Sequence, residues 1–474
     1  MEDTGDVLHN QQAIQEAIAG LLRRVYQHVQ DAARGQTTLF VTRRVLHWDV
    51  EDPRLVDGRT VWSRATGRYV DEQSSNLFEA LTDMESLGWE ERHRLEALVP
   101  NARVGMFHPL AQYLTYAGSR IFAGGADYPS PPSEAIAQFA FERAKGEPPN
   151  FVVVAELEGL AILPSHAQLD LPDVKIGLRQ PTIDDLPSTH SVPSVDAEGA
   201  PPLPVLPALF ADLSFQAENE SRAQLLVAKL INVLRLATLS SVECTHYRVG
   251  LAAPVDFPLM GSSPGEVGRP WLRSSLSDAA LKQMAPLLAT LWGRIQEDES
   301  LGPNPLPDPL GIALGRLNDA LVHDRTIEAR FASAIMGLES LYLPDTTDEL
   351  SFRLRTRVGK AMEFLGHDAL RVAVELKDAY GIRSSYAHGK RAKSTLSAEV
   401  RACHPGLDSL LRAVLGYLRE SIVVFLIDKL PADDMATMLD AALLSLSGTA
   451  SISARLARTR ALLSPTPPPA PGET

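Results

Sequence analysis

The sequence predicts a multidomain α+β protein in which a mixed α/β N-terminal region precedes an all-helical, antiparallel bundle. Three observations indicate this fold class. Strand-like and helix-like segments alternate up to about residue 270, helix-like segments alone follow from Trp271, and proline-rich stretches separate the parts. At 474 residues the chain is long enough for two or three domains, each with its own core.

The first region, residues 1–127, opens with an amphipathic helix. Its apolar residues recur at spacings of three and four and share one helical face: Ile14, Ile18, Leu21, Val25 and Val29. Strand character follows in TLFVTRRVLHW at 38–48, and helical pieces follow in SNLFEALTDMESLGWEERHRLEALV at 75–99. We therefore expect a mixed region, and the sequence does not assign its fold.

The second region, residues 128–300, combines strands with a helix. Three segments have strand composition or alternation: NFVVVAELEGLAILP at 150–164, DVKIGLRQ at 173–180 and HYRVGLAAPV at 246–255. Between them, ESRAQLLVAKLINVLRLATLSS at 220–241 has a strong helical pattern. The proline-rich segment at 186–207 is expected to be an extended linker.

Helical patterns dominate the remainder of the chain. Six of them follow one another with short connections, at 277–296, 308–324, 326–343, 351–366, 368–389 and 406–430. Short connections favour antiparallel neighbours, so we predict a helical domain at 310–430, followed by a helical extension at 431–463. The proline-rich residues 464–474 are expected to be a disordered tail.

Charge and hydropathy exclude several classes of protein. A net charge of −14 argues against a surface that binds nucleic acid everywhere, although residues 311–430 carry slightly more basic than acidic side chains. No apolar run approaches the roughly 20 residues of a membrane-spanning helix, so no membrane partner is expected. The polar, acidic start is unlike a signal peptide, and two cysteines are too few for a disulfide framework. These features predict a cytoplasmic protein.

Conventional catalytic and metal-binding signatures are absent from the sequence. It has no P-loop, no HExxH zinc motif and no EF-hand loop. Cys244 with His246, and Cys403 with His404, offer four metal ligands, but their spacing fits no common zinc module. We interpret both cysteines as buried structural residues and expect neither a metal ion nor another cofactor.

The segment YGIRSSYAHGK, residues 380–390, places Arg383 and His388 five positions apart. A histidine can exchange a proton near neutral pH, and an arginine can hold a phosphate with two parallel hydrogen bonds. Together they suffice for metal-independent cleavage of RNA. The spacing alone is not diagnostic, since it recurs elsewhere in the chain and places the two side chains about 140° apart on an ideal helix. Gly389 predicts that the helix ends there, and a second copy of the chain would also resolve this separation.

The order of features around this pair resembles the Apea-like HEPN domain family. The segment at about 310–430 contains AIMGLESLY, then ELSFRLRTR, then a helix that ends in RSSYAHG. The resemblance implies an all-helical bundle of HEPN type, and many HEPN domains are metal-independent ribonucleases that act as dimers in toxin, CRISPR-associated or anti-phage systems. Arg383 and His388 match the catalytic arginine and histidine of the family. Ser384 stands where active members often carry Asn, Asp or His.

Several further residues become candidates under this resemblance. We predict RNA contacts at Ser384, Tyr386, Lys390, Arg391 and Arg357, and the basic residues Arg353, Arg355 and Lys393 are further candidates for phosphate contacts. Glu339, beside the apolar stripe of its helix, is expected to orient a basic partner. The alternatives are a solvated helix face for the basic residues and a structural role for the pair, with His388 at a helix end and Arg383 bound to a surface carboxylate.

Three functions remain open at this point. The first is an endoribonuclease, homodimeric through the HEPN domain, in phage defence or a toxin-like stress response. Its N-terminal 300 residues would sense a phage or cellular trigger or restrain the nuclease. The second is a non-catalytic HEPN module that binds RNA, a nucleotide or a protein partner, which Ser384 and the acidic net charge favour. The third is a purely structural dimerisation bundle that serves an unrecognised activity of the N-terminal region.

Overall fold

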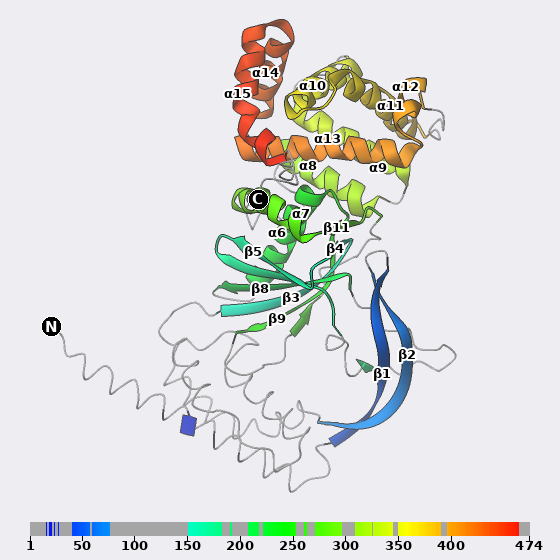
Figure 1. Cartoon of the computed structure of the whole chain (residues 1–474), viewed down its shortest axis with the longest axis vertical. Helices are drawn as coiled ribbons and strands as arrows, with labels where there is room; N and C mark the ends of the chain where they lie inside the picture. Colours follow the sequence, from blue (N-terminus) through cyan, green and yellow to red (C-terminus); the bar gives the residue numbers. More distant parts are fainter. Residues whose placement is uncertain are drawn as a thin grey trace, which may run out of the picture.

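The computed structural model of the chain describes residues 150–182, 207–217, 221–252, 271–295, 309–324, 326–344, 349–389 and 396–463. It also describes the main chain at 40–56, 59–75, 190–191 and 260–262 and the single residues 16, 19, 20, 23 and 27. Most of the predicted helix at 14–29, the helical pieces at 75–99, most of the predicted linker and the predicted tail lie outside this part of the chain. The expected combination of a strand-containing N-terminal part with a helical C-terminal part is confirmed (Figure 1).

A long antiparallel hairpin comes first along the chain. Strand β1 (Phe40–Val56) pairs with β2 (Arg59–Ser75) from Phe40 opposite Ser75 to Val56 opposite Arg59. The short strand β7 (His190–Ser191) pairs with the other edge of β1. The predicted strand at 38–48 therefore belongs to a longer strand, and its partner β2 was not predicted.

The second sheet has six antiparallel strands in the order β10-β9-β3-β8-β6-β5. Buried residues alternate with less buried ones along β3, as the period of two requires when one face covers a core. Phe151 lies opposite Phe215 in the register, and their rings stack with centroids 5.8 Å apart. The strands are β3 (Asn150–Glu158), β5 (His166–Leu171), β6 (Val174–Arg179), β8 (Leu209–Gln216), β9 (Glu243–Leu251) and β10 (Met260–Ser262).

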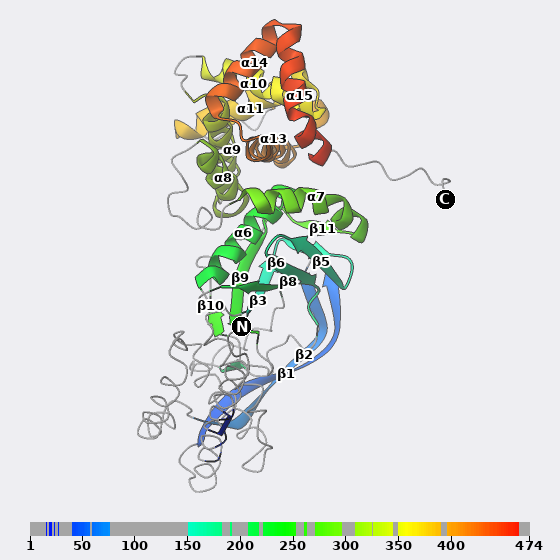
Figure 2. The same ribbon diagram turned by 90° about the vertical axis from the view of Figure 1, so that its left-hand side faces the viewer.

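Two helices cover the face of this sheet that is turned toward the helical region, α6 (Ser221–Thr238) and α7 (Asp278–Arg294) (Figure 2). A small parallel pair, β4 (Leu160–Ile162) with β11 (Ser274–Leu276), lies beside them. The turn from β3 into β4 requires Gly159, whose φ is 80°. A Cβ at this position would also clash with the carbonyl oxygen of Ser241.

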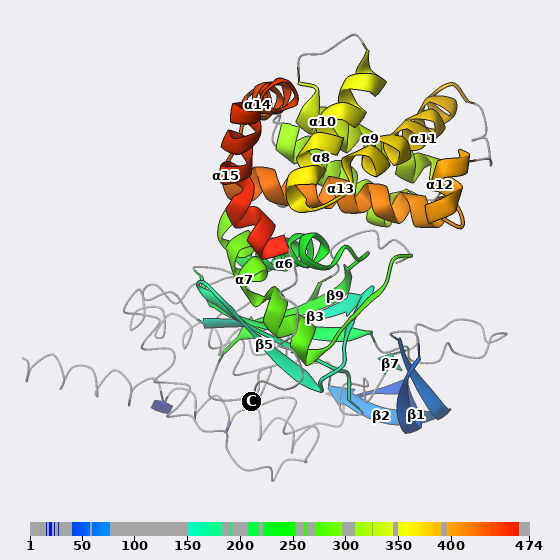
Figure 3. The ribbon, with the colours of Figure 1, turned by 45° about the horizontal axis from the view of Figure 1, so that its top comes forward.

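The C-terminal part consists of packed helices (Figure 3). Helix α8 (Pro309–Asn318) runs into a π-helical turn, η5 (Asp319–His323), and α9 (Ile327–Tyr342), α10 (Leu350–Leu365) and α11 (Ala369–Ala387) follow. Helices α12 (Ala398–Cys403), α13 (Leu407–Asp428), α14 (Ala432–Leu444) and α15 (Leu446–Leu463) complete the chain. Within the described residues, no helix combines the length and the apolarity that crossing a membrane requires.

Helices α9 and α13 form the centre of this bundle. Gly337 lets the two helices approach closely, because a Cβ there would meet the side chain of Leu418. Tyr342 at the end of α9 is fully buried and donates a hydrogen bond to Ser421 on α13, 2.9 Å away. The sequence predicts an apolar stripe on α9 of Ile327, Phe331, Ile335, Leu338 and Tyr342. The last four are buried, and Ile327 is half-buried against the same core.

Polar side chains join the sheet region to the helical region. Arg235 at the end of α6 is buried and donates to the carbonyl oxygen of Val242 at 2.8 Å and to Oδ1 of Asn318 on α8 at 3.0 Å. Asn318 donates in turn to Asn232. Burial lowers the pKa of Arg235 to about 10, so the arginine remains charged at neutral pH.

Candidate functional site

Helix α11 carries the predicted Arg–His pair, and its two ends have clear sequence causes. Asp368 caps its first turn by accepting hydrogen bonds from the main-chain nitrogens of Leu370 and Arg371. The last helical residue is Ala387, and Gly389 adopts a φ of 66°, which a glycine tolerates at a helix end. The predicted helix end is therefore confirmed. It leaves His388 exposed at the end of α11.

Arg383 points from α11 toward α9, where its guanidinium Nη2 donates to Oε2 of Glu339 at 3.2 Å. Its side chain is 28% exposed, and its guanidinium carbon lies 5.6 Å from the centre of the Tyr380 ring. The expectation that Glu339 orients a basic partner is confirmed. The pair spans two helices that are 44 residues apart in sequence.

Glu339 is held in an environment that disfavours its charge. Burial raises the pKa of Glu339 above its ordinary value, and the positive charge of Arg383 opposes this rise. Only one carboxylate oxygen binds Arg383, and Oε1 is buried with no hydrogen-bond partner among the described residues. The geometry fixes the direction of the guanidinium, and the hydrogen bond to Glu339 uses one of its five N–H donors.

No hydrogen bond joins the two predicted catalytic residues in the part of the chain that the structure describes. Each residue of an α-helix advances by about 100° around the axis, so Arg383 lies about 140° from His388. One face of α11, within about 80°, carries four polar residues: Lys377, Tyr380, Ser384 and His388. Arg383 lies about 60° beyond Tyr380, against α9, whereas His388 lies on the open face. Tyr386 is 46% exposed and lies on the opposite side of the helix from Lys377.

Arg357 does not belong to this surface, which corrects its prediction as a phosphate contact. Its side chain is 10% exposed, and its Nε and Nη2 atoms donate to the two carboxylate oxygens of Asp440 on α14, at 2.9 and 2.7 Å. Its Nη1 atom donates to the carbonyl oxygen of Tyr342 at 2.7 Å. The guanidinium therefore holds α10, α14 and the end of α9 together. Lys390, Arg391 and Lys393 lie outside the described residues.

Replacing Arg357 with alanine is expected to lower the free energy of unfolding by about 2–3 kcal/mol, because three charge-assisted hydrogen bonds are lost at a nearly buried position. Urea unfolding measures the change. Asp440→Asn is the matched control and should cost less, since it keeps an acceptor oxygen and its side chain is 50% exposed. A variant that is as stable as the wild type but binds RNA less well would restore the phosphate-contact prediction.

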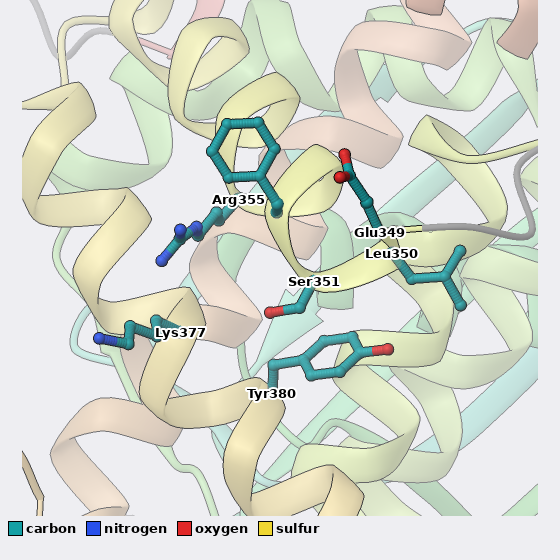
Figure 4. Close-up of a pocket in the computed structure, with 7 residues that line it drawn as sticks. Glu349, Leu350, Ser351, Arg355, Lys377 and Tyr380 are labelled. Atoms are coloured by element: carbon teal, nitrogen blue, oxygen red, sulfur yellow. The ribbon is translucent and has the colours of Figure 1, made fainter.

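An open pocket of about 840 Å³ lies between the start of α10 and the middle of α11 (Figure 4), and Arg383 is close to it without lining it. Tyr380 connects the two features, because it lines the pocket and its ring also lies next to the Arg383 guanidinium. Glu349, at the rim, has a φ of 51°. This left-handed conformation costs a residue other than glycine about 1–2 kcal/mol, and such strain is concentrated at functional sites. The pocket residues are Glu349, Leu350, Ser351, Phe352, Arg355, Lys377 and Tyr380.

A buried polar cluster, missed from the sequence, lies on the other side of α11. Glu375 is 1% exposed and accepts hydrogen bonds from Arg371 at 2.7 Å, from His404 at 2.8 Å and from the hydroxyl of Tyr417 at 2.6 Å. Burial alone would raise the pKa of Glu375, but these three hydrogen bonds outweigh it and hold the pKa below its ordinary value. We refer to these four residues as the Glu375 cluster.

The predicted cysteine–histidine motifs lie in different parts of the fold. Cys244 is in β9, where burial raises the pKa of its thiol to about 12 and makes it unreactive. Cys403 ends α12 and is exposed, which corrects the expectation that both cysteines are buried. Both ring nitrogens of the neighbouring His404 form hydrogen bonds, Nδ1 with Ser409 and Nε2 with Glu375.

A second, smaller pocket of about 420 Å³ adjoins the Glu375 cluster. His367 and Glu420 face each other in its wall, with Nε2 and Oε2 2.7 Å apart. The hydrogen bond with Glu420 raises the pKa of His367 above its ordinary value. The carboxylate therefore favours the protonated imidazole.

His367 is expected to make the free energy of unfolding depend on pH. Because its folded-state pKa is raised above the unfolded value of about 6.5, its contribution is complete below that pH and is lost as pH rises through the folded pKa. The difference in free energy of unfolding between the wild type and His367→Gln should therefore be larger in mild acid than above neutrality. The same substitution in a Glu420→Gln background should show little pH dependence. A difference that grows with pH would contradict the assignment.

Comparisons with known proteins supply no assignment for this chain. No family model matches it, and neither a curated protein nor a solved structure matches it. Its function must be inferred from its residues and their geometry.

Proposed function

We propose that residues 310–430 form a HEPN-type domain that cleaves single-stranded RNA without a metal ion. The observation that carries this proposal is the placement of Arg383. It is anchored by Glu339, it lies beside a pocket with basic and aromatic walls, and it shares its helix with the exposed His388. An anchored guanidinium with one of its five N–H donors on Glu339 suits a phosphate, and an exposed imidazole suits proton transfer.

His388 removes the proton from a ribose 2′-hydroxyl, and that oxygen attacks the adjacent phosphorus. Arg383 stabilises the negative charge that builds on the non-bridging oxygens. The bond from phosphorus to the 5′-oxygen of the next nucleotide breaks, and this oxygen takes up a proton from a histidine. The products end in a 2′,3′-cyclic phosphate and a 5′-hydroxyl, so DNA, which lacks the 2′-hydroxyl, is not cleaved.

Two copies of the chain complete the site. Arg383 and His388 lie about 140° apart on one helix, so a single copy does not present both groups to one phosphate. When two copies face each other, Arg383 of one copy works with His388 of the other, and the second histidine protonates the leaving oxygen. The enzyme acts in the cytoplasm, in phage defence or a toxin-like stress response, and the strand-containing region senses the trigger or restrains the nuclease.

The test is incubation of the purified full-length protein with total RNA in EDTA, followed by analysis of the product ends. Fragments with cyclic phosphate termini, absent when the substrate is DNA of the same sequence, are the expected result. Light scattering of the same sample measures the oligomeric state. Intact RNA at all protein concentrations, with candidate phage triggers present, would overturn the nuclease proposal.

A non-catalytic RNA-binding module is the second candidate function, and two observations favour it. Arg383 already forms an ion pair with the carboxylate of Glu339, and the residue after the arginine is Ser384. In that case RNA binds but stays intact, and binding survives the His388→Ala substitution. The incubation in EDTA separates the two functions.

A further inference from the structure

The pocket near Arg383 combines aromatic and basic side chains that are exposed to solvent. The packing of the bundle does not explain an exposed aromatic side chain, and neither does solubility. Phe352 is 55% exposed, although a side chain of its size contributes most when it is buried. Phe352 does not belong to the buried apolar stripe of α10, which contains Leu354, Val358 and Ala361. Tyr380 adds a second aromatic ring from α11. Two aromatic rings are thus available at one open concave surface.

Basic side chains accompany the rings. The guanidinium carbon of Arg355 lies 5.3 Å from the centre of the Phe352 ring, and Lys377 of α11 is exposed on the same pocket. Figure 4 shows the Arg355 and Lys377 side chains ending on one side of the pocket, whereas Glu349 lies on the other. The basic side of the pocket is therefore separate from Glu349, the one carboxylate among the described residues that line it.

We propose that this pocket receives an unpaired nucleotide, whose base stacks on Phe352 and whose phosphate lies between Arg355 and Lys377. Every base has an aromatic face, so exposed aromatic side chains beside a basic groove bind single strands with little sequence preference. A duplex cannot use the rings, because its bases are already stacked and paired. The substrate class is single-stranded or looped RNA.

The location of the pocket fixes which nucleotide it holds. The Tyr380 ring lies next to the Arg383 guanidinium and also lines the pocket, so the bound nucleotide adjoins the phosphate that Arg383 contacts. This placement relative to the cleaved bond rests on the proposed function. Binding of a single strand in the pocket does not depend on cleavage.

The test measures binding by full-length His388→Ala protein in EDTA, using fluorescence anisotropy of a short, unstructured, fluorescein-labelled oligoribonucleotide. Phe352→Ala should weaken binding about 5- to 150-fold, the loss typical of one stacked base. Lys377→Ala should reduce the slope of log Kd against log salt by about 0.7, the value for one phosphate contact on a single strand. DNA of the same sequence should also bind, and an RNA duplex should bind more weakly and respond little to Phe352→Ala.

Matched controls exist elsewhere in the chain. Leu370→Ala removes another exposed apolar side chain, at the start of α11, and Lys175→Ala removes an exposed lysine of β6. Neither should change single-strand affinity or its salt dependence. Because Phe352 and Lys377 are exposed, thermal unfolding of their variants should match that of the parent, which separates a binding defect from misfolding.

The outcomes for the pocket and for the nuclease are distinguishable. Tight single-strand binding that depends on Phe352, in a wild-type protein that never cleaves RNA, supports the pocket and overturns the nuclease. Cleavage that requires His388, with an affinity unaffected by Phe352→Ala and Lys377→Ala, overturns the pocket alone. A protein that binds no single strand, or binds an acidic peptide equally well through Lys377 without Phe352, also overturns it.

Discussion

Replacing His388 with alanine is expected to slow RNA cleavage by about 10²- to 10⁴-fold, the usual contribution of a positioned general acid–base. Replacing Arg383 with alanine should slow it by about 10²- to 10³-fold, the usual loss when one group that stabilises the developing negative charge is removed. Single-turnover rates in EDTA, with protein in excess over a labelled single-stranded RNA, measure both effects. Under these conditions the rates report the chemical step without product release.

His388→Ala is the cleaner of the two substitutions. The imidazole is exposed at the end of α11, so its removal should leave the fold intact, whereas Arg383→Ala leaves the partly buried Glu339 without its cation. Arg383→Lys keeps a positive charge but not the planar fork, and should give an intermediate rate. His166→Ala on β5 and Arg412→Ala on α13 remove exposed residues of the same types and should cleave normally. A His388→Ala protein with the wild-type rate would contradict the assignment of His388.

Mixed dimers test whether two copies share the site. A protein that carries only Arg383→Ala and one that carries only His388→Ala should each be slow alone. When they are mixed and allowed to exchange subunits, a shared site regains one intact arginine and one intact histidine from different copies, so part of the activity should return. Sites contained within single chains would gain nothing from mixing.

Local features of this site could be predicted from the sequence because their causes are local. Gly389 alone indicated where α11 ends, and the conformational freedom of glycine provides the reason. The apolar spacing of α9 indicated its buried face and placed Glu339 beside it. The partner of Glu339 was not predictable, because Arg383 is 44 residues away and the pairing depends on how α9 and α11 pack.

The position of Arg357 in the sequence already carries a signal against an exposed phosphate contact. Arg357 lies three residues after Leu354 and next to Val358, on the buried stripe of α10. Glu375 occupies the same kind of position on α11, beside Val372, Leu376 and Ala379. A charged residue on an apolar stripe indicates a buried polar contact, but its partner comes from another helix and cannot be identified without the fold.

Replacing Glu375 with alanine is expected to lower the free energy of unfolding by about 3–5 kcal/mol, the usual result of removing one partner from a buried ionic cluster. The substitution leaves the ring of His404 and the hydroxyl of Tyr417, both buried, without their acceptor. Glu375→Gln keeps one acceptor oxygen and should lose less. Glu363→Ala on α10 is the matched control, because Glu363 is exposed and, among the residues that the structure describes, forms its ion pair with Lys360; it should cost about 1 kcal/mol or less.

The pH dependence separates the charge of Glu375 from its packing. Because its folded-state pKa is lowered, its charge contributes stability above the unfolded pKa of about 4.3, and this contribution is lost as pH falls through the folded pKa. The difference in free energy of unfolding between the wild type and Glu375→Gln should therefore be largest near neutral pH and shrink in acid. A difference that stays constant in acid would show that volume and hydrogen bonding, without the charge, account for the stabilisation. A loss no larger than that of Glu363→Ala would show that the Glu375 cluster does not hold α11 against α13, and the anchoring of Arg383 would then depend on α9 alone.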